Sequence, residues 1–268
     1  MAMSLINSLG SALVYPDQGN FVTNKKLWNL YAQEWSPSED WVKDIARPNN
    51  SSQDIGSSSN EVDELKFVGQ EWSPDTDLEE ILQQFVYDYI DEDKLVAEIG
   101  CGGGRLAAKV APRVKKMDCY DISKEMISQA EKALSFLSNV DFHILEEPSF
   151  SKNCEKLYDF IYCFDVMVHM DLHLINKYFG EIGRALKDDG KAFISTANIT
   201  STGGWARFSK QRKYTVGGFY FLCPEMVRFL LHKNGLRPVK EGPIEESTNV
   251  YLNRDYLVLV EKSDEVSP

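Results

Sequence analysis

The sequence lacks any apolar run that approaches the roughly 20 residues needed to cross a bilayer, which predicts no membrane partner. Its mildly apolar start, residues 1–13, lacks the basic stretch that opens a secretory signal. The five cysteines include no Cys-x-x-Cys pair, and three of them lie in apolar or glycine-rich stretches. This usage is typical of reduced thiols rather than of disulfides or zinc ligands. We therefore expect a cytoplasmic protein that holds no metal.

Basic residues are scarce. The chain has 29 Lys and Arg against 41 Asp and Glu, which gives a net charge of −12. Residues 61–93 alone hold twelve acids and one base, Lys66. An acidic surface repels phosphate backbones, so we expect no nucleic-acid partner. The acidic stretch itself is better interpreted as a solvated surface than as a binding site.

Aromatic side chains are frequent near the N-terminus. Trp28, Tyr31 and Trp35 fall at i, i+3 and i+7, which predicts a helix. Residues 48–60 are polar, small and low in complexity, which predicts a flexible loop. We expect residues 1–75 to form an N-terminal helical cap around this loop.

The string Gln-Glu-Trp-Ser-Pro occurs twice, at residues 33–37 and 70–74. In each copy Ser-Pro is followed by acids, which is typical of a helix start. The second copy leads into an amphipathic pattern that predicts a helix ending near Ile90.

From residue 95 onward, strand-like and helix-like stretches alternate. The expected strands are 95–99, 116–120, 140–145, 158–164, 191–196, 236–241 and 256–260. The expected helices are 105–110, 123–137, 171–186 and 224–234. Ser123 and Asp171 are placed to begin two of these helices, and Gly190 to terminate one. Five strands alternating with helices predict a parallel doubly wound sheet, to which the last two strands could add an edge hairpin.

The glycine-rich stretch Glu98-Ile99-Gly100-Cys101-Gly102-Gly103-Gly104 follows the first of these strands. A strand that enters such a loop and then a helix forms a seat for a nucleotide-like ligand. Asp121 ends the next strand, where a carboxylate can accept hydrogen bonds from ribose hydroxyls. Each feature alone also has a plain structural interpretation, a tight turn for the loop and a helix-capping acid for Asp121.

Several motifs together resemble those of class I S-adenosylmethionine-dependent methyltransferases. The matching stretches, in that family's order, are 98–106, 120–130, 158–170, 186–191 and 254–260. The resemblance spans residues 70–262. It implies an α/β, doubly wound, mostly parallel seven-stranded sheet, that is, a Rossmann-like methyltransferase fold with an antiparallel last strand. It also implies that residues 76–268 form the cofactor-binding catalytic domain.

The resemblance implies S-adenosylmethionine as the cofactor, S-adenosylhomocysteine as its product, and no metal. The residues that it assigns to the cofactor are Glu98, Gly100, Cys101, Gly102, Gly104, Asp121, Ile122, Met126, Glu146 and Phe164. Asp121 would bind the ribose, with Ile122 and Met126 against the adenine. Glu146 stands where the family more commonly has an Asp that reads the adenine amino group.

Catalysis of methyl transfer asks mainly for positioning, and a general base adds to it when the acceptor has a proton to lose. His169 is the first candidate base and Asp165 the second, because both follow the fourth strand at the carboxyl edge of the sheet. The plain structural interpretation of His169 is a packed or capping histidine before Asp171.

The acceptor site is expected between two aromatic segments, the N-terminal cap and a lid insertion at 198–223. The residues expected to contact the acceptor are Tyr31, Trp35, Trp72, Trp205 and Tyr214. Aromatic walls favour an apolar or cationic small molecule, although most such rings belong to protein cores. We expect methylation of N or O rather than of C or S, by a monomer or homodimer.

Two other functions fit parts of the sequence. A nicotinamide-dependent oxidoreductase would use the same loop and acid, but the spacing Gly-x-Gly-x-Gly differs from the Gly-x-Gly-x-x-Gly usual in such sites. A non-catalytic cofactor-binding protein would keep Glu98, the loop and Asp121 and lack turnover.

Overall fold

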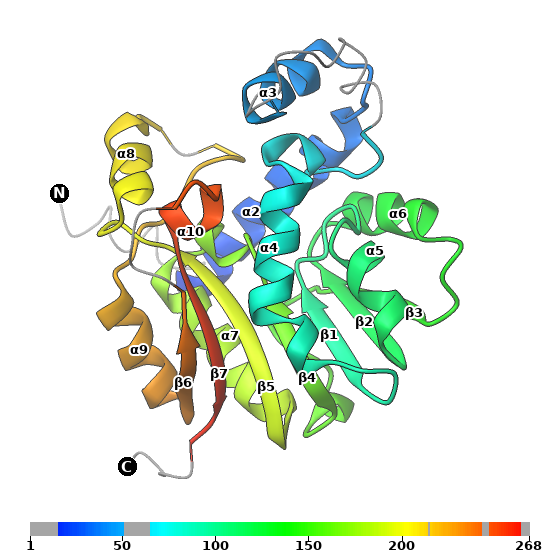
Figure 1. Cartoon of the computed structure of the whole chain (residues 1–268), viewed down its shortest axis with the longest axis vertical. Coiled ribbons are helices and arrows are strands. Elements are labelled where there is room, and N and C mark those ends of the chain that lie inside the picture. Colours follow the sequence, from blue (N-terminus) through cyan, green and yellow to red (C-terminus); the bar gives the residue numbers. More distant parts are fainter. Residues whose placement is uncertain (1–15, 51–64, 214, 243–246, 264–268) are drawn as a thin grey trace, which may run out of the picture.

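The computed structural model describes residues 16–50, 65–213, 215–242 and 247–263. Its centre is a seven-stranded sheet with the order β3-β2-β1-β4-β5-β7-β6 (Figure 1). The strands are β1 (Leu95–Ile99), β2 (Lys116–Asp121), β3 (Val140–Ile144), β4 (Tyr158–Cys163), β5 (Leu186–Ala197), β6 (Leu236–Glu241) and β7 (Asp255–Lys262). The predicted fold class is therefore confirmed.

Strand β7 is the reversed strand of the sheet. The pairs from β3 to β5 are all parallel, whereas β7 pairs antiparallel with both β5 and β6. The last strand thus lies between two earlier ones and leaves β6 at the edge. The hairpin expected from the last two strands forms, but it joins the sheet through β7.

Helices cover both faces of the sheet. The helices of the described residues are α2 (Pro16–Glu34), α3 (Asp40–Asn50), α4 (Asp75–Phe85), α5 (Ala107–Val110), α6 (Lys124–Ala133), α7 (Leu172–Ala185), α8 (Thr202–Lys210), α9 (Pro224–Lys233) and α10 (Val250–Arg254). Apolar residues of α4, α5 and α6 pack on one face, and those of α7 and α9 on the other. Both faces of β4 and β5 are therefore buried, as in other parallel sheets.

Two expected helix starts are confirmed by their caps. The Ser123 side chain accepts a hydrogen bond from the Met126 N–H, and the Asp171 side chain accepts one from the Leu174 N–H. Each bond satisfies one of the free donors of a first helical turn.

Several expected boundaries are wrong. Helix α7 ends at Ala185, and Gly190 lies inside β5, where a Cβ would come within 3.0 Å of the Tyr158 carbonyl. The close packing of β4 against β5, rather than a helix end, therefore requires this glycine. The helix expected to reach Ile90 ends at Phe85 and continues as a 3₁₀ turn.

The segment 198–223 is not wholly irregular, because it contains α8, whose cap is Ser201. Helix α10 was not expected. It begins after Asn249, whose side chain accepts hydrogen bonds from the N–H groups of Tyr251 and Leu252. Helix α3 extends to Asn50, past the expected start of the loop 48–60. The rest of that loop lies outside the described residues.

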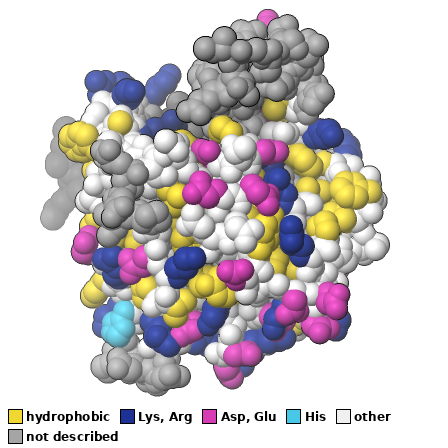
Figure 2. Space-filling view, viewed as in Figure 1, with side chains coloured by type: hydrophobic (Ala, Val, Ile, Leu, Met, Phe, Trp, Pro, Cys, Tyr) yellow, Lys and Arg dark blue, Asp and Glu magenta, His cyan; other side chains and the backbone are white. Residues whose placement is uncertain are grey.

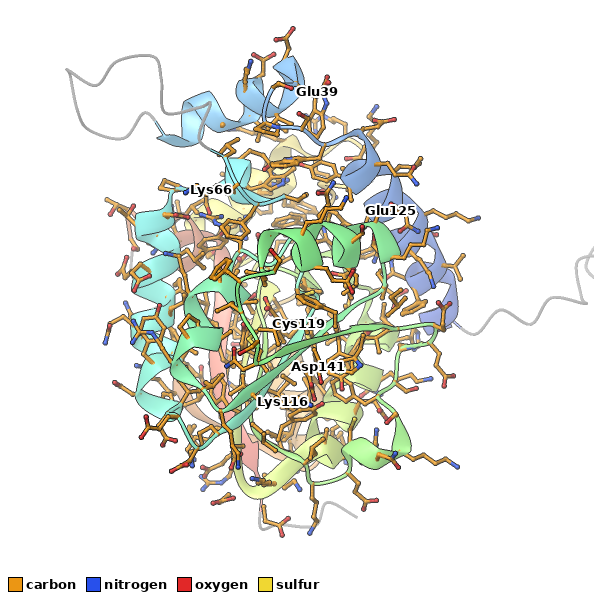
Figure 3. The ribbon with its side chains drawn as sticks, turned by 90° about the vertical axis from the view of Figure 1, so that its right-hand side faces the viewer. Glu39, Lys66, Lys116, Cys119, Glu125 and Asp141 are labelled. Atoms are coloured by element: carbon orange, nitrogen blue, oxygen red, sulfur yellow. The ribbon has the colours of Figure 1, made fainter. Side chains whose placement is uncertain are left out.

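Helix α2 crosses the carboxyl edge of the sheet and packs against α6 and α7. Figure 3 shows α2 beside α6, with Glu125 at the end of α6 that is nearer to α2. The Asn29 side chain of α2 accepts hydrogen bonds from the Ser123 hydroxyl, at 2.7 Å, and from the Glu125 N–H.

None of the described helices is both long and apolar enough to cross a membrane.

Candidate active site

A cavity of about 520 Å³ lies at the carboxyl ends of β1, β2 and β4, where parallel sheets bind ligands. Helix α2 borders it on one side and helices α8 and α10 on the other. The predicted residues that line it are Tyr31, Trp72, Glu98, Gly100, Cys101, Gly102, Asp121, Ile122, Met126, Phe164, Asp165 and His169. Its size falls within the about 300–1,000 Å³ usual for small-molecule sites.

The glycine loop forms one wall. Gly100 has a φ of 76°, and a Cβ there would come within 2.5 Å of the Val166 side chain. Gly102 has a φ of 51°, and a Cβ there would meet no protein atom within 4 Å, so its backbone faces open space. Gly104 does not line the cavity. A Cβ at Gly104 would come within 2.8 Å of Leu134, so this glycine allows the end of α6 to pack closely against the loop.

Two buried carboxylates stand beside this loop. Burial raises the pKa of Glu98 to about 8. A 3.0 Å hydrogen bond from the Tyr162 hydroxyl favours the ionised form of Glu98 and so partly opposes this rise. Burial likewise raises the pKa of Asp121 to about 6, although its oxygens accept hydrogen bonds from the Gly102 N–H at 2.9 Å and the Ser123 N–H at 2.8 Å. Asp121 therefore holds the glycine loop in place as well as lining the cavity.

Glu146 does not lie in the cavity, and this is a correction. Its side chain is 78% exposed and forms a 2.6 Å ion pair with Lys25 of α2. Just after β3 the buried Leu145 side chain lines the cavity, so the side chain of the next residue, Glu146, points to solvent.

The turn after β4 carries the candidate base. Asp165 has a left-handed φ of 56°. Such a backbone conformation is uncommon for a residue other than glycine and is found mainly at functional or tightly held positions. Its N–H donates to the Ser195 hydroxyl at 2.8 Å, and its carboxylate accepts from Arg254 at 2.6 Å.

His169 is buried in an aromatic setting, at 5.1 Å from the Trp28 ring and 5.3 Å from the Phe219 ring. Its Nδ1 lies 2.8 Å from the Gly218 carbonyl oxygen. A carbonyl only accepts, so Nδ1 carries the hydrogen and Nε2 carries the lone pair of the neutral ring. Burial lowers the pKa of His169, which favours this neutral form.

Two of the five expected acceptor residues line the cavity. Tyr31 and Trp72 line the cavity with their rings stacked at 6.1 Å. Trp35 lies behind them, where its indole N–H donates to the buried Glu71 carboxylate at 3.1 Å. Trp205 is 58% exposed on α8 and turned away from the cavity. Tyr214 lies outside the described residues.

Several cavity residues had no assigned role in the sequence. Tyr178 of α7 has a buried hydroxyl without a hydrogen-bond partner among the described residues. Arg207 and Lys210 come from α8, and Arg254 from the end of α10. The signal that could have revealed the two cations of α8 is charge, because residues 198–223 hold four Lys or Arg and no acid.

Comparison with known proteins identifies this arrangement. Residues 72–241, more than half of the chain, match the family described as the methyltransferase domain. The chain belongs to this family. The resemblance of the sequence motifs to methyltransferases is thus confirmed. Neither the matched family nor the antiparallel strand β7 supports the alternative of a nicotinamide-dependent oxidoreductase.

Named relatives agree at the level of the domain. A ubiquinone biosynthesis O-methyltransferase of Rickettsia typhi is 29% identical over 126 residues, which cover 46% of this chain and 49% of that protein. The chain thus spans about half the length of the curated relatives it matches.

Two solved structures share the fold. The magnesium protoporphyrin IX methyltransferase of Synechocystis, solved with bound S-adenosylhomocysteine, has a TM-score of 0.60 at 18% identity and covers 90% of this chain and 99% of its own. The geranyl diphosphate C-methyltransferase of Streptomyces coelicolor has a TM-score of 0.56 at 13% identity and covers 85% of this chain and 100% of its own.

Proposed function

We propose that this chain transfers the methyl group of S-adenosylmethionine to an oxygen atom of a small-molecule acceptor. The observation that carries the proposal is the joint placement of Glu98, the glycine loop and Asp121 along one wall of the cavity, with His169 facing the same space. The O-methyltransferase names of the curated relatives support oxygen as the acceptor atom.

The residues present fit the cofactor. The Asp121 carboxylate lies at the end of β2, where it can accept from ribose hydroxyls, and Gly102 presents bare backbone to the cavity. The buried Tyr178 hydroxyl would gain a hydrogen-bond partner from a polar ligand. When bound, S-adenosylmethionine supplies a methyl group on a positively charged sulfur.

The chain's own contribution is to position the acceptor and to take its proton. An alcohol or phenol loses a proton when its oxygen becomes an ether, and His169 can take that proton at Nε2 because Nδ1 is held by Gly218. Burial, Arg254 and Arg207 lower the pKa of His169 and disfavour the resulting imidazolium, whereas the nearby Asp165 carboxylate raises this pKa and would stabilise the imidazolium. Trp28 and Phe219 each pack edge-to-face against the imidazole ring.

Binding and transfer are tested separately. S-adenosylhomocysteine and S-adenosylmethionine should stabilise the protein against heat, by about 2.7 kcal/mol at 100 times the dissociation constant, and NADH should not. Stabilisation by NADH alone would contradict the proposal. Transfer of a labelled methyl group to small molecules of a cell extract then separates an enzyme from a non-catalytic binder.

The base is tested by His169→Gln. We expect kcat to fall by roughly 10²–10⁴-fold with little change in the affinity for S-adenosylhomocysteine. Unchanged turnover at saturating acceptor would remove His169 from the mechanism. His173→Gln, a change at an exposed position of α7 outside the cavity, is the matched control.

A further inference from the structure

Most of the acidic and basic residues that line the cavity come from different elements. Glu98 and Asp121 lie at the ends of β1 and β2, beside the glycine loop. Arg207, Lys210 and Arg254 lie at the far end, on α8 and at the end of α10. Figure 2 shows basic side chains gathered at the upper left, over α8. In a chain of net charge −12 this grouping is a local exception.

The cations of the cavity differ in how their charge is compensated. Arg105, at the cofactor end, pairs with Asp75 at 2.7 Å. Arg254 pairs with Asp165 at 2.6 Å and with Asp255 at 2.5 Å. Among the described residues no carboxylate pairs with Arg207, whose guanidinium donates to the Gly217 carbonyl at 2.6 Å. Asp165 and Asp255 attract Arg207 from a distance, and Arg254 repels it. A partly buried guanidinium with no carboxylate bonded to it leaves further donors for a ligand.

The position of Arg207 is fixed. Its guanidinium lies 4.6 Å from the centre of the Phe219 ring, and Arg254 lies 4.7 Å from the same centre. Gln211, just after α8, holds the Phe219 backbone through two hydrogen bonds of 2.8 and 3.0 Å. The Phe219 ring is therefore already covered by the protein's own cations and is closed to a cationic acceptor. At this end of the cavity the cations of the protein disfavour a cationic acceptor, whereas the rings of Trp28, Tyr31 and Trp72 line the rest of it.

We propose that Arg207, assisted by Lys210, binds an oxyanion of the acceptor, a carboxylate or a phosphate, carried on an apolar frame. The apolar frame would lie against Trp72, which a Cβ at Gly217 would contact at 3.6 Å together with Arg207. A guanidinium fork matches the two oxygens of a carboxylate or phosphate. The inference rests on the proposed function for the occupant of the other end of the cavity.

The test uses matched pairs of probes on the full chain saturated with S-adenosylhomocysteine. The pairs are 3-phenylpropanoate with 3-phenylpropanamide and phenyl phosphate with phenol, measured by calorimetry or ligand-observed NMR. The acid of at least one pair should bind about tenfold or more tightly than its neutral partner. The pair with the larger ratio distinguishes carboxylate from phosphate.

In Arg207→Gln the ratio should fall to about 1, and in Lys210→Gln it should fall by a smaller factor. Arg207→Lys should keep part of the ratio, because the charge remains and the fork is lost. The control is Arg212→Gln, which removes the same charge from an exposed side chain outside the cavity and should leave the ratio unchanged. Thermal unfolding without ligand verifies that the variants are folded.

Equal binding of acid and neutral partner to the wild type overturns the proposal, as does a ratio that survives Arg207→Gln. If Arg207→Gln weakens S-adenosylhomocysteine and leaves the ratio intact, the arginine binds the carboxylate of the cofactor, and the proposal is also overturned. Repeating the probes without S-adenosylhomocysteine separates the two hypotheses. An acid preference in a protein that binds no S-adenosylhomocysteine would contradict the proposed function and leave the anion site standing.

Discussion

At the scale of single residues, the Tyr178 hydroxyl has the clearest expected effect. It is buried in the cavity wall without a partner among the described residues. Tyr178→Phe removes a polar atom that is costly to bury, so the ligand-free protein should be as stable as the wild type or up to about 1–3 kcal/mol more stable. If the cofactor satisfies this hydroxyl, the affinity for S-adenosylhomocysteine should fall about 2–10-fold.

Thermal unfolding and calorimetry of the same variant measure the two effects. The control is Tyr256→Phe, a buried tyrosine of β7 outside the cavity lining, which should leave the affinity unchanged. A Tyr178→Phe protein that binds S-adenosylhomocysteine as tightly as the wild type would show that this hydroxyl does not contact the ligand.

Glu98 predicts a pH dependence of stability. Its folded pKa of about 8 exceeds the ordinary value of 4.5, so the folded state binds more protons than the unfolded state between these values. The stabilisation is fully present below about pH 4.5 and is lost as the pH rises through about 8, by at most about 1.4 kcal/mol per pH unit. Asp121 has the same sign but a window that ends near pH 6.

Urea unfolding of the ligand-free protein above about pH 6.5 therefore isolates Glu98. Between pH 6.5 and about 8 the wild type should lose stability and then level off, and Glu98→Gln should lose distinctly less, because its amide does not titrate. The exposed Glu92→Gln serves as control and should follow the wild type. Parallel curves for wild type and Glu98→Gln would mean that this carboxyl is already ionised at neutral pH.

At the scale of elements, one carboxylate attaches α2 to the loop that precedes α4. The fully buried Glu71 accepts hydrogen bonds from the Tyr31 hydroxyl, from the Trp35 indole and from the Gly69 N–H. Tyr31 and Trp35 belong to or adjoin the end of α2, so these bonds tie the helix that covers the cavity to the sheet domain. Burial and the Glu71 charge both raise the pKa of Tyr31, which keeps its hydroxyl protonated and able to donate.

Tyr31→Phe should loosen this attachment. A hydrogen bond to a charged group contributes about 1.5–3 kcal/mol, so the amides of α2 should exchange with deuterium about 10–150 times faster. The amides of the central strands should be unaffected. Tyr87→Phe removes a similar Tyr–Glu bond on α4, away from the cavity, and should not change exchange in α2. Unchanged α2 protection in Tyr31→Phe would show that apolar packing alone holds the helix.

The elements also show where sequence reasoning succeeds. The glycine loop, Asp121 and the caps Ser123 and Asp171 were predicted because each depends on backbone geometry within a few residues. Trp35 and Trp205 were misplaced because helical spacing does not tell which face of a helix meets a cavity. Glu146 was misplaced for the related reason that one step along the chain reverses the direction of a side chain near a strand end.

At the scale of the whole molecule, the fold follows from alternating strands and helices, but the far end of the cavity does not. Arg254 and Arg207 are distant from the glycine loop in the chain. Arg254 reaches the same space because β7, which follows it, inserts between β5 and β6, and Arg207 because α8 follows β5. From the sequence alone, Tyr178 is predicted only as one more apolar position of an amphipathic helix. Its role depends on how α7 packs under β1 and β4, which no local pattern specifies.

Arg254 joins the last strand of the sheet to the fourth, and its loss should therefore weaken the whole fold. The Asp255 side chain has no exposed area, and the Arg254 side chain is 15% exposed. Arg254→Met would leave two carboxylates without their cation and should cost about 3–5 kcal/mol of unfolding free energy in urea. Arg254→Met with Asp255→Asn should recover much of this loss, because a neutral amide needs no counter-charge. Arg237→Met, which breaks an exposed pair with Glu261 between β6 and β7, should cost about 1 kcal/mol or less. Equal losses for the two arginine variants would show that the buried cluster contributes no more than a surface pair.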